Sequence, residues 1–417
     1  MEGISLSSNQ NQSKTSEESV RKTLDEAIAA YGFYLFTKGH ALKGVLEDAP
    51  QAFPSLSKLI KNLEKSGRCK SFSTNDPETL QKCIDEYRFR EGVLSGIWHY
   101  TIWRHTPEEI EKSTEGLKIL ANGGKQVIND LYNKPYQQFK ITIPKEYRDW
   151  RILEIIPEVW ATASLIVRYL EDPEGYGKKL SKYLGKKLLV AKYISILKDA
   201  LSKIPSFILQ YLKGHRKAEM DDVEIRKELK EVIENYIRYA SSINDAREVV
   251  LNNAPEALPS LATLIENLRR WDKSNLLTND PEILREYADI YYFMGSFMRS
   301  MLTWSVSRWK HPPEEIEGFK KGLEKLANWG EHVIMGLYII YKAVKEIKLE
   351  EILKDKNYQT ISLYELRKAH VSARIHAGER IKHVLVNYFR NPEEYEDQIM
   401  KYVVILGRLS MKYVGKS

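Results

Sequence analysis

The sequence predicts an all-α fold, arranged as a tandem duplication of a roughly six-helix bundle domain with two pseudo-equivalent halves. Apolar residues recur every three or four positions, which is typical of helices with one buried face. Helix-start signals divide the chain, whereas strand patterns are nearly absent; FKITIP at 139–144 is the best candidate for a short extended link. Finally, several sequence segments occur twice along the chain, in the same order.

The duplication is clearest where APQAFPSLSKLIKNLEK at 49–65 matches APEALPSLATLIENLRR at 254–270 in ten of 17 positions. The phrase TNDPE likewise stands at 74–78 and at 278–282. Four further pairs keep the same order: 20–31 with 225–236, 103–111 with 309–317, 119–132 with 325–338, and 169–176 with 388–395. The repeated unit is far longer than the roughly 20–50 residues of a solenoid repeat, so we interpret it as a whole domain.

The limits of the domains follow from this repeat and from composition. The first residues are polar, rich in Ser, Asn and Gln, and without the apolar core of a signal peptide, so we predict a disordered polar tail at 1–16. Helical repeat domain 1 is predicted at 17–204 and domain 2 at 218–417, with a basic linker at 205–217. We expect either a monomer with internal pseudo-symmetry or a homo-oligomer.

The overall composition is that of a globular protein with two cores. The chain has 417 residues, of which 43% are hydrophobic and 29% charged. Its two cysteines, Cys69 and Cys83, exclude a disulfide-built scaffold and a CxxC metal site. No run of 18 apolar residues is present, so we predict no transmembrane segment and a cytoplasmic location.

The six helices of the first half are predicted at about 17–46, 53–65, 77–104, 107–132, 145–171 and 174–203, and the second half repeats them with a longer connection between its fourth and fifth helices. Their starts carry capping residues. Asp76 and Asp280 each precede a proline, and their carboxylates can accept from free backbone N–H groups. Thr106 and Glu109 have the spacing of a capping box.

Two segments predict a break within a helix. NGG at 122–124 lies opposite NWG at 328–330 in the repeat, inside an otherwise helical pattern. Asn and Gly there indicate a break, a kink or a close helix crossing. The glycine pair is not a phosphate-binding loop, because it lacks both the preceding strand and the GxxxxGK[ST] pattern.

The end of the third helix carries the same residue types in both halves. These are Trp98, Trp103, Arg104 and His105 in the first half, and Trp304, Trp309, Lys310 and His311 in the second. One interpretation is a stacking platform for bases or another flat ligand. The other, which we favour, is structural: Trp fills a core, and basic side chains suit a helix C-terminus.

No catalytic, cofactor-binding or metal-binding residue is predicted. His376, Glu379 and His383 would share a helix face, but Arg380 and Lys382 crowd that face with positive charge. The chain contains no nucleophile elbow, HExxH, zinc ribbon or Rossmann fingerprint.

Carboxylates recur in both halves, as Asp85 with Asp289 and Glu109 with Glu315, and they need no catalytic explanation. An enzyme with a site assembled from distant residues stays an open alternative, and a non-enzymatic protein is favoured.

Basic residues concentrate between 178 and 217, where Asp199 is the one acid. Outward lysines on such a helix could contact nucleic-acid phosphates or anionic lipid headgroups, although a solvated face is the simpler interpretation. The candidate contact residues are Lys178, Lys179, Lys182, Lys186, Lys187, Lys213, Arg216 and Lys217.

The function predicted from these features is a non-enzymatic helical scaffold or adaptor that binds a macromolecular partner, expected to be a protein, through its paired bundles. The alternative is a nucleic-acid-binding protein that contacts phosphates through the basic 178–217 region, and an enzyme of unknown reaction is third.

Overall fold

The structure is a computed structural model of the chain. It describes residues 6–133, 157–173 and 222–399, apart from residues 68, 70, 103, 104, 273–277, 279, 309, 355–362 and 398. The described part of the chain is helical and contains no strand, which confirms the predicted all-α class. The predicted extended link at 139–144 and the predicted helix at 174–203 lie outside the described residues.

The described helices fall into two series, one before residue 174 and one after residue 221. The first series is α1 (Leu6–Asp48), η1 (Pro50–Ala52), α2 (Phe53–Lys65), α3 (Pro77–Ile102), α4 (Pro107–Asn122), α5 (Gly124–Leu131) and α7 (Pro157–Glu171). The second series is α11 (Asp222–Asn253), η4 (Pro255–Ala257), α12 (Leu258–Trp271), α13 (Pro281–Val306), α14 (Pro313–Trp329), α15 (Glu331–Lys354) and α16 (Leu363–Arg390).

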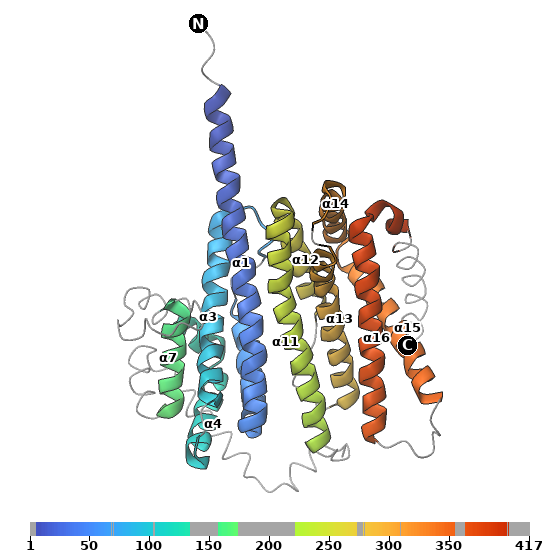
Figure 1. The fold of residues 1–417 in the computed structure, drawn as a ribbon. Coiled ribbons are helices and arrows are strands. Elements are labelled where there is room, and N and C mark those ends of the chain that lie inside the picture. The colour runs from blue at the N-terminus through green and yellow to red at the C-terminus, as the bar shows by residue number, and fades with distance from the viewer. Residues whose placement is uncertain are drawn as a thin grey trace, which may run out of the picture.

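Helix α1 differs from the prediction at its start. It begins at Leu6, within the segment predicted to be a disordered tail, and its first turns project beyond the other helices (Figure 1). The chain has no Gly or Pro between residues 4 and 31, so nothing interrupts a helix that grows outward from its packed part.

Six helices stand side by side in one layer, in the order α7, α3, α1, α11, α13 and α16 (Figure 1). Helices α1 and α11 meet at the centre of this layer and run antiparallel: Asp25 pairs with Arg247 near one end, and Glu47 with Lys230 at 3.3 Å near the other. Buried apolar residues from both series form one continuous cluster around this junction.

Helices α1 and α11 approach closely because two glycines of α1 face α11. A Cβ atom at Gly32 would collide with Asn244, and one at Gly39 would collide with Ile237. Because glycine has no side chain, the two helix backbones can approach each other closely at both positions. A larger side chain at either position would push the two helices apart.

The predicted helix starts and breaks are confirmed where they can be examined. Thr106 accepts from the backbone N–H of Glu109, whose side chain returns a bond to Thr106, so the capping box is complete. The side chain of Asp280 accepts from the N–H of Glu282 at 3.0 Å. Helix α5 starts at Gly124 with φ 63°, and Gly330, with φ 67°, separates α14 from α15. Positive φ favours glycine, which explains why these breaks carry it.

A disulfide joins Cys69, in the loop after α2, to Cys83 on α3. The sequence analysis considered a disulfide scaffold and a metal site, and it did not foresee a single bond. No helix in the described part of the chain is long and apolar enough to cross a membrane.

Breaking this disulfide should destabilise the first half. Because it closes a chain loop of 14 residues' separation, its loss is expected to lower the free energy of unfolding by about 3 kcal/mol. Urea unfolding with and without dithiothreitol measures this difference. A Cys69→Ser, Cys83→Ser variant should unfold like the reduced parent, and dithiothreitol should not change its stability. If dithiothreitol lowers the stability of this variant by the same amount, the effect in the parent does not come from the Cys69–Cys83 disulfide.

Candidate functional site

A cavity of about 510 Å³ lies at the junction of the two halves. Its walls come from α1, α2 and α3 on one side and from α11, α12 and α13 on the other, so the antiparallel helix pair at the centre of Figure 1 forms part of it. Its size falls within the range of small-molecule sites in proteins, about 300–1,000 Å³. We call this cavity the junction pocket.

Six buried tyrosines line the junction pocket. When the two halves of the sequence are aligned, they occupy three pairs of equivalent positions. Tyr31 and Tyr34 stand where the second half has Tyr236 and Tyr239, and Tyr87 stands where it has Tyr291; none of the six is more than 5% exposed. The sequence analysis missed them. YGFY at 31–34 and YIRY at 236–239 were the available signal, since they lie at the offset that aligns 20–31 with 225–236.

The tyrosine rings pack on one another within each half. The ring centroids of Tyr34 and Tyr87 are 5.9 Å apart and stacked, and those of Tyr236 and Tyr291 are 4.9 Å apart and edge-on. Aromatic pairs at such distances stabilise beyond the area that they bury. Packed aromatic rings therefore make up much of the wall of the junction pocket.

An ion pair from the first half closes one side of the junction pocket. Lys38 Nζ lies 2.8 Å from Glu64 Oε1 and 4.9 Å from the ring centroid of Tyr236, and the hydroxyl of Tyr34 donates to the same carboxylate at 3.1 Å. Burial by itself lowers the pKa of Lys38, but the Glu64 carboxylate outweighs burial and holds that pKa above its usual range. Burial likewise opposes ionisation of Glu64, yet Lys38 holds the pKa of that carboxyl below its usual range.

Two arginines supply further positive charge. Arg90 pairs with Glu86, and Arg269 lies 2.5 Å from Glu266 while donating to the hydroxyl of Tyr87 at 2.9 Å. Burial raises the pKa of Tyr87 to about 12, against the opposing effect of both arginines. The phenol is therefore protonated at neutral pH.

The charges of the junction pocket do not repeat between the halves, although the tyrosines do. Arg269 occupies the position that aligns with Glu64, and Met294 the position that aligns with Arg90. The tyrosines that line the pocket therefore recur at aligned positions of the sequence, whereas the charged residues do not.

Three buried hydroxyls of the junction pocket have no hydrogen-bond partner in the described part of the chain. They are Ser57 Oγ, Tyr236 OH and Tyr239 OH. Tyr236 is 1% and Tyr239 2% exposed. These oxygen atoms are covered by the surrounding side chains and do not open into the cavity, and Tyr338 and Tyr341, outside the pocket lining, also have buried hydroxyls that are unpaired among the described residues.

In the first half, the described aromatic and basic residues predicted at the end of the third helix do not contact one another as a single group. Trp98 stacks on His40 with centroids 4.7 Å apart, and His105 stacks on Tyr100 at 3.9 Å. Trp98 and His105 both line a second cavity of about 700 Å³. Trp103 and Arg104 lie outside the described residues.

In the second half the corresponding tryptophan belongs to the core. Trp304 is fully buried, with its ring stacked between His311 at 4.0 Å and Phe319 at 4.2 Å. Both faces of this indole are therefore covered by the protein's own rings. Lys310 is exposed, and Trp309 lies outside the described residues.

The basic residues predicted to contact nucleic acid lie outside the described residues. They are Lys178, Lys179, Lys182, Lys186, Lys187, Lys213, Arg216 and Lys217. Within the described ranges, no group of three or more His, Cys, Asp or Glu side chains is arranged to hold a metal ion.

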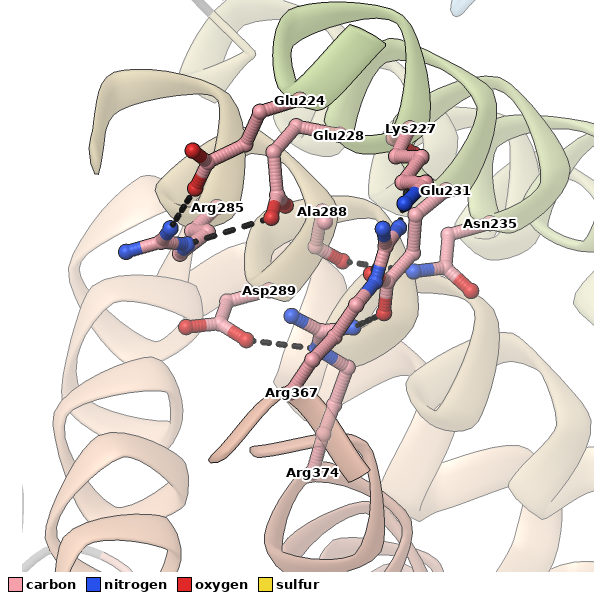
Figure 2. A network of polar contacts seen from close by, with 10 residues as sticks. All are labelled: Glu224, Lys227, Glu228, Glu231, Asn235, Arg285, Ala288, Asp289, Arg367 and Arg374. Carbon is pink, nitrogen blue, oxygen red and sulfur yellow. Dashed lines mark hydrogen bonds and ion pairs between the residues drawn. The ribbon is translucent and has the colours of Figure 1, made fainter. Parts of the chain in front are cut away.

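Asp289, one of the carboxylates that recur in the sequence, lies in a buried ion network between α11, α13 and α16 (Figure 2). It accepts from Arg374 Nε at 2.6 Å and from Lys345 Nζ of α15 at 2.6 Å, and Arg374 also pairs with Glu231. Its counterpart Asp85 is only half-buried and accepts from Gln81 at 3.1 Å. The network joins four helices and has a structural role.

The chain matches no protein-family model, no curated protein and no solved structure. The comparisons therefore assign no role to the junction pocket.

Proposed function

We propose that the protein is a binding protein whose two halves together enclose a small organic molecule in the junction pocket. The observation that carries this proposal is a cavity of about 510 Å³ that is lined by six buried tyrosines from both halves of the chain. The aromatic and apolar walls would bury the body of such a ligand, and the polar side chains of the lining would fix its orientation.

The packing of α1 on α11 supports the predicted two-fold relation of the halves. In the repeat numbering, Ile237 is the counterpart of Gly32, and Asn244 is the counterpart of Gly39. Gly32 packs on Asn244 while Gly39 packs on Ile237, so each contact is the reciprocal of the other. Reciprocal contacts are typical of an isologous interface, and the junction pocket would then lie on a pseudo-two-fold axis.

The predictions of a scaffold and of a nucleic-acid-binding protein, made from the sequence, remain predictions. A scaffold that binds a macromolecule through its paired bundles remains compatible with a small-molecule site between them. The nucleic-acid alternative depends on the 178–217 region, and so do the proposed basic linker and the exact domain limits.

Filling the junction pocket tests the proposal. Met294 is fully buried in the pocket wall, and a Met294→Trp side chain would occupy part of the 510 Å³. In a thermal-shift screen of small organic molecules, a true ligand at 100 times its Kd stabilises the parent by about 2.7 kcal/mol. This stabilisation should disappear in Met294→Trp.

The matched control is Met335→Trp, because Met335 is 42% exposed and lies outside the pocket lining. This variant should keep every stabilisation seen with the parent. If Met294→Trp also keeps them all, the molecules bind elsewhere and the junction pocket is not the site.

A further inference from the structure

We propose that the first half of the chain holds a second ligand site, for an uncharged aromatic molecule of one or two rings, in the cavity of about 700 Å³ that is lined by α1, α3, α4 and α7. We call this cavity the first-half cavity. It shares no lining residue with the junction pocket, so the inference goes beyond the proposed function and does not depend on it. Its volume lies within the range of small-molecule sites, about 300–1,000 Å³.

Two residues of the cavity wall are smaller than the residues that align with them in the second half. Ser113 aligns with Phe319, and Leu170 aligns with Phe389. Both phenylalanines are fully buried in the second half. The first-half cavity therefore lies where the aligned positions of the second half carry two large rings.

In the second half these rings pack on one another. The ring centroid of Phe319 lies 4.2 Å from that of Trp304 and 5.0 Å from that of Phe389. His311 in turn stacks on Trp304 at 4.0 Å. Four aromatic side chains thus form one continuous packed group there.

The first half does not form the same group. Trp98, which aligns with Trp304, is half-buried and stacks on His40, while Tyr100 stacks on His105 with centroids 3.9 Å apart. Tyr100 thus supplies one ring beside the histidine, but a cavity remains next to it. Protein interiors are normally close-packed, so a space that the aligned residues fill with rings and these residues leave open favours a site for a ligand.

The wall of the first-half cavity combines apolar side chains with ring surfaces. The buried apolar residues include Val45, Ile97, Leu117 and Leu170, none more than 3% exposed. The rings are those of His40, Trp98, Tyr100 and His105. Aromatic rings that pack on one another gain free energy beyond the area that they bury, so this wall favours a flat aromatic ligand over an aliphatic one of equal size.

The charges of the lining do not favour a charged ligand. Lys43 stands against two acids, Glu47 and Asp48, and Glu47 already pairs with Lys230 at 3.3 Å. Burial and the charge of Lys43 lower the pKa of His40, so this imidazole is neutral at pH 7. Glu47 and Asp48 are exposed, and the cavity therefore opens to solvent beside them.

A pair of matched probes tests the preference for an aromatic ligand. 2-Naphthol and decahydro-2-naphthol have the same carbon skeleton and hydroxyl group, but only the first is flat and aromatic. In calorimetric titrations of the full chain, 2-naphthol is expected to bind about tenfold more tightly. Equal affinities, or no binding of 2-naphthol, would overturn the inference. Trp98→Leu, which removes one ring from the wall, should reduce the difference between the probes.

Two variants that fill the cavity locate the site. Ser113→Phe and Leu170→Phe each introduce the residue of the second half, from α4 and from α7, and each should weaken 2-naphthol binding at least tenfold. Two positions on different helices keep the test decisive if one variant folds poorly. The control is Ser19→Phe, which adds the same ring at an exposed position of α1 outside the lining and should bind like the parent. Parental affinity in both filled variants would show that the probe binds elsewhere.

The Met294→Trp variant separates this inference from the proposed function. It fills the junction pocket and should leave the affinity for 2-naphthol unchanged. If Met294→Trp abolishes binding while Ser113→Phe and Leu170→Phe keep it, the probe occupies the junction pocket; the present inference is then wrong and the proposed function is supported. Loss of binding in the two filled variants alone supports the inference, whatever the screen shows for the junction pocket.

Discussion

Replacing Asp289 with asparagine is expected to lower the free energy of unfolding by about 3–5 kcal/mol, because the change leaves buried positive charge without its partner. Asp289 is 3% exposed and accepts from both Arg374 and Lys345. Glu231 and Glu346 keep one contact each to these cations, but neither replaces the carboxylate between them.

Chemical unfolding of the Asp289→Asn variant measures this loss. A matched control lies one turn away on the same helix: Glu286 pairs with Lys342 at 3.4 Å, and both side chains are well exposed. Glu286→Gln should change the stability by about 1 kcal/mol or less. A loss in Asp289→Asn no larger than that of the control would show that the network carries no stability.

A second large effect is expected from Glu91, whose carboxyl is largely buried. Its Oε2 has no hydrogen-bond partner in the described part of the chain, and burial raises the pKa of this group from 4.5 to about 8, although Arg88 opposes the shift. Between these two values the unfolded chain releases the proton and the folded chain keeps it. The stability contributed by Glu91 is therefore complete below pH 4.5 and is lost as the pH rises through about 8.

The Glu91→Gln variant has no carboxyl to ionise, so its stability does not fall through this group as the pH rises. It should match the parent near pH 4 and become more stable than the parent as the pH rises, by on the order of 5 kcal/mol above pH 9. Urea unfolding of both proteins across this range gives the difference. Glu78→Gln serves as control, because the Glu78 side chain is 85% exposed; a parallel pH profile for Glu91→Gln and the parent would contradict the expected effect.

The helices and their ends could be predicted because they depend on neighbouring residues. Thr106 and Glu109 are three positions apart, and the glycine that separates α14 from α15 stands in the local phrase NWG. Such signals are local in the chain and need no knowledge of the rest of the fold.

The junction pocket could not be predicted in the same way, because its contacts join distant residues. Arg269 reaches the hydroxyl of Tyr87 across 182 positions of sequence, and Lys38 meets Tyr236 from the other half. A missing hydrogen bond, such as that of Tyr239, is also invisible in a sequence, since it depends on everything that surrounds the hydroxyl. The repeated tyrosines can be seen in the sequence, but the sequence does not show that they line the same cavity.

The opposite charges at the aligned positions Glu64 and Arg269 have a consequence for the symmetry of the junction pocket. In a homodimer each residue near the axis stands opposite its own copy, so an acid would oppose an acid and a base would oppose a base. In one continuous chain the two aligned positions can carry different residues, and here Glu64 and Arg90 line the pocket from one side while Arg269 and Asp272 line it from the other. A pocket whose two sides differ in this way can hold an unsymmetrical ligand in one orientation, which a strictly symmetric dimer cannot do.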